Sequence, residues 1–429
     1  MKITTALKQL LDFSRQHSGY YRQHWHQVPD NFTRLADLPV IDPTRYWRDS
    51  HDLDQWPVLT AAGRDALVFK TGGSTGSGKL SLFTRNEWQT LVSDFGRQLT
   101  DQLDPGDRVA NLFYVGDLYA SFLFIHDSLK QASVDVSEFP FTGAVESGVL
   151  AEAITEYRIN VLAGVPAQLL KFAAWLEQRS QRLEGVKTVL YGGESLFCAQ
   201  RQILARVFPQ ARFASIGYAS VDAGLIGTSD RDCAPGEHRM LESHSVLEIL
   251  DEVSGEVIEE CGRNGQLVIT NLTRRLMPLI RYPVGDLACW RDPPATARRK
   301  FALMGRSMNG QRVRVGTLSL QIGEIDSLMQ RLRIGSDWQL VIEQRGAKDL
   351  LSLKWLPATQ LHDNETASTD LRLELIRQHP LIEQLQNEQL LELQVIRCAS
   401  ADLVCHPRSG KLQRIVDRRV YQAPTGEQT

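Results

Sequence analysis

The chain has 429 residues, of which 42% are hydrophobic and 23% charged, and its formal net charge is −3. The length suggests two or three domains, and the composition is that of a soluble globular protein. The charge gives no electrostatic basis for nucleic-acid binding, and no apolar run is long enough to predict a membrane span. The six cysteines are scattered without a C-x-x-C pair, which predicts a reduced, cytoplasmic protein.

The predicted elements change in character along the chain. Residues 1–13 have an amphipathic pattern, so we expect a helix there and no signal peptide. From Thr84 to about residue 220, helix and strand patterns alternate, which implies βαβ units and a layered α/β core. Thr84 with Glu87 predicts a capping box, and Pro166 predicts the first turn of a helix. Short antiparallel strands follow residue 240, and a small α+β unit with two polar helices begins near Gly305.

The stretch TGGSTGSGKL at 71–80 contains the phosphate-loop pattern G-x-x-x-x-G-K. Leu80, however, stands where a serine or threonine would bind Mg²⁺. The segments on both sides have the period of a strand, so we expect the loop to join a hairpin and not to open onto a helix. A P-loop NTPase and a chance glycine-rich turn are the alternatives.

Four further motifs follow in order: GYASVDAG at 217–224, RYPVGD at 281–286, GRSMNGQRVRVG at 305–316 and SGKLQR at 409–414. Together with the glycine-rich loop, they resemble the adenylate-forming superfamily. The stretch 246–286 and the chain length resemble its phenylacetate–CoA ligase branch. GDRVANLF, NVLAGVPAQLLKF and GKLQRIVDRR are similar to a subgroup that contains indoleacetate–lysine ligases and a phenazine-antibiotic biosynthesis protein.

The resemblance implies an α/β fold with two domains. Residues 1–305 would form a large domain of layered βαβ units with a small β-barrel unit, and residues 306–429 a small mobile α+β domain. It also implies an AMP-forming ligase that activates an aromatic carboxylic acid with ATP and Mg²⁺ and transfers it to CoA. An amine acceptor, which would give an amide in specialised metabolism, and a carrier-protein thiol are alternatives. We expect a monomer or homodimer without a nucleic-acid or membrane partner.

Both reactants of such an enzyme are anions, so charge neutralisation and positioning dominate the chemistry. The resemblance makes Lys79 and Lys411 catalytic residues and Asp222 a metal ligand in place of glutamate. It implies nucleotide contacts by the phosphate-loop residues, an adenine segment, a ribose carboxylate and a hinge arginine: Thr71, Gly73, Ser74, Thr75, Gly76, Gly193, Glu194, Tyr218, Ala219, Asp286 and Arg306. The candidates for the acid pocket are Tyr114, Tyr119 and Phe139.

Several residues depart from the family pattern. Val221 and Val284 remove hydroxyl groups, and Met308 replaces the hinge aspartate. A rival interpretation is therefore a degenerate adenylating fold that binds nucleotide or acid without turnover. Cys233 and His238 lie where some relatives begin a zinc site, but the other expected cysteines are absent. A CoA 3′-phosphate would need cations, for which the sequence offers the basic runs 274–275 and 298–300.

Overall fold

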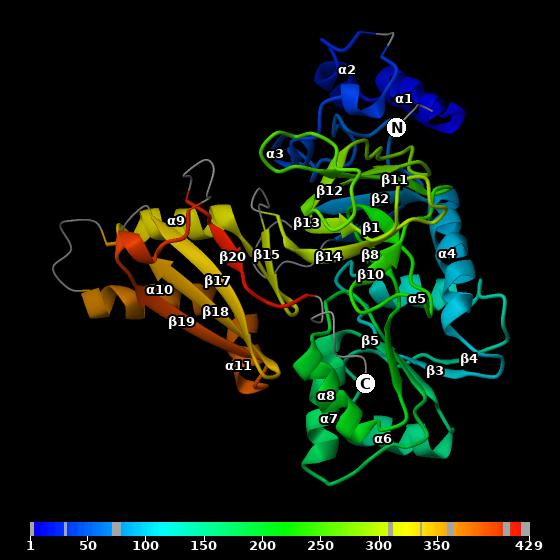
Figure 1. Ribbon diagram of the computed structural model, residues 1–429, viewed down its shortest axis with the longest axis vertical. Helices are drawn as coiled ribbons and strands as arrows, with labels where there is room; N and C mark the ends of the chain where they lie inside the picture. Colours follow the sequence, from blue (N-terminus) through cyan, green and yellow to red (C-terminus); the bar gives the residue numbers. More distant parts are fainter. Residues whose placement is uncertain are drawn as a thin grey trace. The chain divides into compact units, whose positions relative to one another are not determined.

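The computed structural model describes residues 4–29, 32–70, 79–307, 312–334, 337–357, 364–405 and 412–421. These residues divide into two compact units, one ending at Met304 and the other beginning at Gly305. The segment Phe197–Leu204 is grouped with the second unit. Figure 1 labels the helices and strands of both units.

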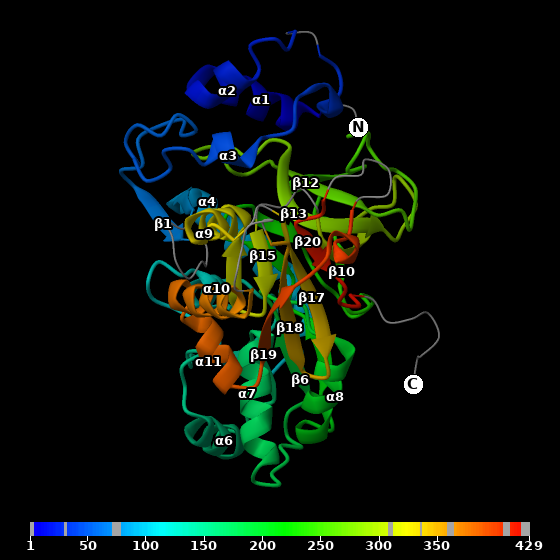
Figure 2. The ribbon, with the colours of Figure 1, turned by 90° about the vertical axis from the view of Figure 1, so that its left-hand side faces the viewer.

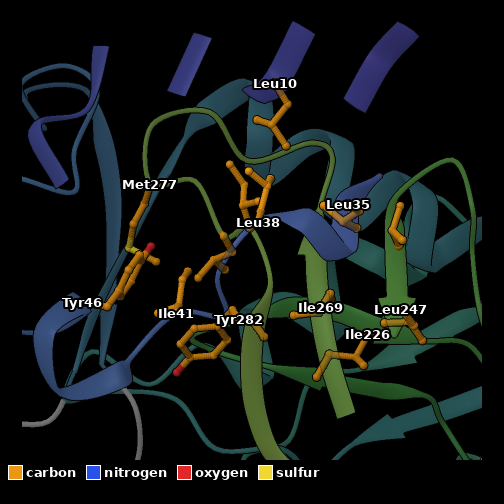
Figure 3. Packing of buried hydrophobic residues seen from close by; sticks show 14 of the residues in the cluster. Leu10, Leu35, Leu38, Ile41, Tyr46, Ile226, Leu247, Ile269, Met277 and Tyr282 are labelled. Carbon is orange, nitrogen blue, oxygen red and sulfur yellow. The ribbon is translucent and has the colours of Figure 1, made fainter. Parts of the chain in front are cut away.

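The N-terminal segment is helical, as its amphipathic pattern predicts. It contains α1 (Thr5–His17), α2 (Gly19–His24) and α3 (Pro43–Tyr46). The Thr4 hydroxyl caps α1 by accepting from the Leu7 N–H, and the helix buries leucines on one face. Figure 3 shows Leu10, Leu35 and Leu38 of this segment packed above sheet residues such as Ile269. The N-terminal segment thus covers one face of the antiparallel sheet described below.

The glycine-rich stretch joins two antiparallel strands, which confirms the predicted hairpin. In β1 (Ala66–Lys70) and β2 (Leu80–Thr84), Lys70 pairs with Leu80 across the loop. Helix α4 (Arg85–Leu99) follows β2 directly. Its predicted capping box is present: the Thr84 hydroxyl accepts from the Glu87 N–H at 3.1 Å, and the Glu87 carboxylate accepts from the Thr84 N–H at 2.8 Å.

A parallel five-stranded sheet with the order β4-β3-β5-β6-β7 forms the α/β core. This confirms the predicted α/β class with a parallel sheet. Every residue of β5 and β6 is buried, as is usual for central parallel strands. The strands are β3 (Arg108–Asn111), β4 (Ser137–Phe139), β5 (Val161–Gly164), β6 (Thr188–Tyr191) and β7 (Arg212–Ser215); the helices are α5 (Ser121–Leu129), α6 (Ser147–Glu156), α7 (Pro166–Glu177) and α8 (Cys198–Val207). Pro166 occupies the first turn of α7, as predicted.

The antiparallel sheet of the first unit has the order β10-β14-β13-β12-β11. Because β10 and β11 are its two edges, the barrel that the sequence suggested is not confirmed. The strands are β8 (Tyr218–Ser220), β9 (Gly224–Gly227), β10 (Glu237–Arg239), β11 (Ser245–Leu250), β12 (Gly265–Asn271), β13 (Tyr282–Trp290) and β14 (Lys300–Arg306), of which β8 and β9 form a separate pair.

The second unit contains a mixed sheet with the order β19-β18-β17-β20 and a separate β15-β16 pair. Helices α10 and α11 pack on β19, as Figure 2 shows. After Gly305, the described residues form three α-helices, α9, α10 and α11. The sequence predicted two helices in this unit. The elements are β15 (Arg312–Val315), β16 (Leu318–Gln321), α9 (Ile322–Leu332), β17 (Trp338–Arg345), β18 (Lys348–Trp355), α10 (Asn364–Gln378), α11 (Leu381–Asn387), β19 (Leu391–Arg397) and β20 (Ile415–Asp417).

Glu87 links α4 to a distant loop, which leads to a stability prediction. Its second carboxylate oxygen accepts from the N–H groups of Arg275 at 2.6 Å and Leu276 at 2.8 Å. Glu87→Ala would leave three N–H groups without their acceptor, so the free energy of unfolding should fall by about 3 kcal/mol in urea titrations. Glu177→Ala is the control, because Glu177 pairs with exposed Arg206 and its loss should cost less than about 1 kcal/mol. Equal losses would contradict this assignment.

His238 leads to a prediction about pH. Its side chain is buried on β10 against Phe301, and burial lowers its pKa to about 3. An unfolded histidine has a pKa of about 6.5, so below that pH the unfolded chain binds a proton that the folded chain does not. Between pH 8 and pH 5 the wild type should therefore lose about 2 kcal/mol more unfolding free energy than His238→Gln. Identical pH profiles of the two proteins would refute this account.

Candidate functional site

Three candidate segments follow the carboxyl ends of parallel strands. Tyr114 comes after β3, Gly193 after β6 and Tyr218 after β7. Because parallel strands place their carboxyl ends at one edge of a sheet, these segments share that edge, which is where ligands bind in open α/β sheets. The candidate site is built on this edge and on the neighbouring strand β13.

Lys79 lies immediately before β2 and points toward an acidic and aromatic group. Its ammonium nitrogen is 3.8 Å from the Asp222 carboxylate and 3.4 Å from the Tyr282 hydroxyl. The same nitrogen is 5.2 Å from the centre of the Trp47 ring. The structure therefore brings together Lys79 and Asp222, which were predicted from the sequence as a catalytic residue and a metal ligand.

Asp222 is 7% exposed, and its carboxylate receives several hydrogen bonds. One oxygen accepts from the Tyr282 hydroxyl at 2.8 Å. The other accepts from the Ser220 hydroxyl at 2.7 Å and from the Ala223 N–H at 3.2 Å. These donors stabilise a buried negative charge. In the described ranges no group of three or more His, Cys, Asp or Glu side chains is arranged as a metal site, so Asp222 offers a single carboxylate.

Tyr218 and Asp286 are also in direct contact, through a hydrogen bond from the tyrosine hydroxyl to the carboxylate. Ala219 follows Tyr218 on β8, and Asp286 lies on β13. The ring of Tyr218 also contacts the ring of His238, with ring centres 5.4 Å apart. The residues expected at the adenine and at the ribose therefore touch one another.

Two tyrosine–aspartate pairs connect the same two segments. Tyr218 and Asp222 are four residues apart, as are Tyr282 and Asp286. Each tyrosine donates to the aspartate of the other segment. Tyr282 was not among the functional residues predicted from the sequence, although it lies within the motif RYPVGD.

The other nucleotide candidates have simpler surroundings. Gly193 has φ +78°, a conformation that glycine adopts without strain, and Glu194 beside it is half-buried. Arg306 is the last residue of β14 and belongs to the second unit. Thr71, Gly73, Ser74, Thr75, Gly76 and Lys411 lie outside the described residues, as does Met308.

The acid-pocket candidates separate into two locations. Tyr114 and Tyr119 lie in one loop after β3, and the Tyr114 hydroxyl is 3.4 Å from the Gln168 side-chain oxygen. Phe139 ends β4, and its ring stacks on exposed Tyr157 with ring centres 5.8 Å apart. Tyr114 and Tyr119 therefore lie close to the carboxyl ends of the parallel strands. The ring of Phe139, in contrast, contacts a surface residue.

Two of the cations considered for a CoA phosphate are core residues. Arg274 is 1% exposed, and its guanidinium lies 3.9 Å from the Phe83 ring centre and donates to the Asp222 carbonyl oxygen at 2.8 Å. Arg299 is 5% exposed and packs on Trp290. Both guanidinium groups are used inside the fold, so of the two basic runs these two arginines are not available to a ligand phosphate.

The side chains of Cys233 and His238 make contacts inside the fold and are not arranged as zinc ligands. The Cys233 thiol donates to Asp230 at 3.3 Å, and burial raises its pKa to about 11. A thiol with that pKa is protonated at neutral pH, whereas zinc binds the thiolate. His238 packs against the rings of Tyr218 and Phe301, which also contact each other.

No protein-family model matches the chain. It is 24% identical to the phenylacetate–coenzyme A ligase of Thermus thermophilus over 96% of this chain and 95% of that protein. It is 26% identical to the indoleacetate–lysine synthetase of Pseudomonas savastanoi over 58% of this chain and 59% of that protein. None of the helices in the described ranges has the length and hydrophobicity of a transmembrane segment.

Among solved structures, the fold matches 2-hydroxyisobutyryl-CoA ligase, crystallised with 2-HIB-AMP and CoA. The TM-score is 0.73 at 18% identity, over 97% of this chain and 89% of the ligase. At that identity the match concerns the fold alone. The chain is thus similar to phenylacetate–CoA ligases along nearly its whole sequence, and its fold is similar to that of an acyl-CoA ligase, which supports the resemblance to the phenylacetate–CoA ligase branch.

Proposed function

We propose that this protein is an AMP-forming ligase that activates an aromatic carboxylic acid with ATP and transfers the acyl group from the adenylate to CoA. Two contacts in the first unit carry the proposal. Lys79 faces Asp222, and Tyr218 contacts Asp286. These are residues that the phosphates, the metal and the ribose of ATP would need, and contacts between residues far apart in the sequence hold them in place.

The residue roles follow from charge and hydrogen-bonding capacity. Lys79 supplies a positive point charge for the phosphates, beside the backbone N–H groups proposed for Thr71, Gly73, Ser74, Thr75 and Gly76. Asp286 is acceptor-only when ionised and suits the two ribose hydroxyls. Gly193, Glu194, Tyr218 and Ala219 would border the adenine. The family resemblance implies that Arg306 would contact the nucleotide and that Lys411 would bridge the α-phosphate and the substrate carboxylate.

Asp222 fits a magnesium ion as a single oxygen ligand. Mg²⁺ prefers oxygen donors and usually keeps several waters while it binds substrate phosphates, so one carboxylate is sufficient. The bound ion would neutralise phosphate charge. The same carboxylate oxygen that accepts from Tyr282 also faces Lys79, so Asp222 would orient both a cation of the protein and a cation of the substrate.

The acceptor has a second candidate, an amine. The similarity to indoleacetate–lysine synthetase favours it. The burial of Arg274 and Arg299 also favours it, because it removes two cations that a CoA phosphate could have used. We place CoA first because similarity to the phenylacetate–CoA ligase extends over 96% of the chain.

The test of this function is ATP–pyrophosphate exchange with a panel of aromatic acids, followed by mass spectrometry of reactions that contain CoA or amines in parallel. We expect acid-dependent exchange and a CoA thioester. Amide formation without any thioester would establish the amine acceptor instead. Tight ATP binding without exchange for any acid would refute the enzyme and support the rival binding protein.

Asp286 provides a prediction about nucleotide affinity. Asp286→Asn should raise the dissociation constant of ATP at least about tenfold, because hydrogen bonds to a charged group are worth about 1.5–3 kcal/mol. Calorimetry with a non-hydrolysable analogue measures this without turnover. The control is Asp104→Asn, since Asp104 pairs with exposed Arg231 on the surface and should leave the affinity unchanged. An unaltered affinity in Asp286→Asn would remove the ribose role.

A further inference from the structure

We propose that Trp47 is a positioning residue of the adenylation site. Its indole N–H orients the hydroxyl of Tyr282, Tyr282 in turn holds the Asp222 carboxylate, and the resulting group fixes the ammonium of Lys79. This inference rests on the proposed function, which gives Lys79 and Asp222 their roles. No sequence motif includes Trp47.

The donors and acceptors in this group determine the atom to which the Tyr282 hydroxyl gives its proton. The Trp47 indole can only donate, and its nitrogen is 3.1 Å from the Tyr282 oxygen. The Lys79 ammonium, also a donor only, is 3.4 Å from the same oxygen. A phenol has one proton to give, and the oxygen of Asp222 is 2.8 Å away. With two donors directed at its oxygen, Tyr282 gives that proton to Asp222.

Burial makes this arrangement stronger than it would be in water. Tyr282 is 2% exposed, Asp222 7% and Trp47 9%. Hydrogen bonds are electrostatically stronger in such surroundings, and chains of them polarise one another. The ring of Trp47 also faces the Lys79 ammonium at 5.2 Å, a distance at which the aromatic ring attracts a cation. Trp47 therefore contacts the lysine directly and the aspartate through Tyr282.

The position of Trp47 is itself fixed. It is the C-cap residue of α3, the short helix that ends at Tyr46. The Tyr46 hydroxyl donates to the Pro278 carbonyl oxygen at 2.8 Å, and the Trp56 indole donates to the Tyr46 carbonyl oxygen at 3.1 Å. The N-terminal segment is thereby fastened four residues before Tyr282, close enough for Trp47 to reach its hydroxyl.

The chain offers a matched control in Trp56. Its ring lies 5.4 Å from the Trp47 ring in the same aromatic cluster, and it is 2% exposed. Its indole donates to a backbone carbonyl and not to Tyr282. Trp47→Phe and Trp56→Phe therefore remove an equivalent buried N–H, but only the first breaks the connection to Asp222.

The kinetic test uses the full chain in acid-dependent pyrophosphate exchange. Tyr282→Phe should lower the exchange rate about tenfold, the value of one hydrogen bond to a charged group, and Trp47→Phe should lower it several-fold. The double variant should be no slower than Tyr282→Phe, because Trp47 acts through that hydroxyl. Trp56→Phe should lose as much unfolding free energy as Trp47→Phe but less of the exchange rate, because its N–H acts on the backbone of Tyr46 and not on Tyr282.

A second measurement needs no turnover. In ¹⁵N-tryptophan-labelled protein, the indole N–H signal that Trp47→Phe removes should shift in Tyr282→Phe and in Asp222→Asn, while the Trp56 signal stays in place. If the wild type shows no exchange with any acid, the proposed function fails and this spectrum alone decides the positioning role. Additive losses in the double variant, equal exchange losses in Trp47→Phe and Trp56→Phe, or a Trp47 signal unmoved by Asp222→Asn would each overturn the proposal.

Discussion

The crossed tyrosine–aspartate hydrogen bonds are the constraint on which the candidate site depends. Tyr218 donates to Asp286, and Tyr282 donates to Asp222. The segment that contains Tyr218 lies outside the five-stranded antiparallel sheet, whereas Tyr282 begins a strand of that sheet. Two partly desolvated carboxylates would be unfavourable without donors. The crossed bonds satisfy both carboxylates and at the same time join the parallel-sheet edge to the antiparallel sheet.

The N-terminal segment reinforces this junction from the other side. The hydroxyls of Tyr21 and Tyr46 both donate to the carbonyl oxygen of Pro278 at 2.8 Å. Figure 3 shows Tyr46 beside Met277, with Ile41 next to Tyr282. A carbonyl oxygen has two lone pairs, so a single backbone group can hold two aromatic side chains from separate helices. The N-terminal segment therefore holds the loop before Tyr282 at Pro278, and Asp222 holds the Tyr282 hydroxyl.

Local sequence patterns predicted the elements better than they predicted the surroundings of single residues. The hairpin around the glycine-rich stretch, the capping box of Thr84 and Glu87, and the strands of the parallel sheet depend on neighbours in the sequence, so periodicity and capping chemistry were sufficient. Whether the antiparallel sheet closes into a barrel could not be predicted in this way, because closure depends on whether its two edge strands pair with each other. Neighbouring arginines show the same limit: Arg275 is exposed and Arg274 is buried. Arg274 is in the core because Leu82 and Asp222, distant in sequence, present carbonyl oxygens to it.

The wide sequence separation of the contacting residues has a consequence for how the protein becomes able to bind its ligand. The bond between Trp47 and Tyr282 joins residues 235 positions apart, and that between Lys79 and Tyr282 joins residues 203 apart. Contacts of such long range form slowly, since large loops must close before the contacts are gained. Neighbouring strands such as β5 and β6 are much closer along the chain. A folding intermediate with the parallel sheet in place would thus still lack the assembled site, so nucleotide binding would report on completion of the whole first unit. Because the ligand binds the completed state, it would also stabilise that state over its precursors by mass action.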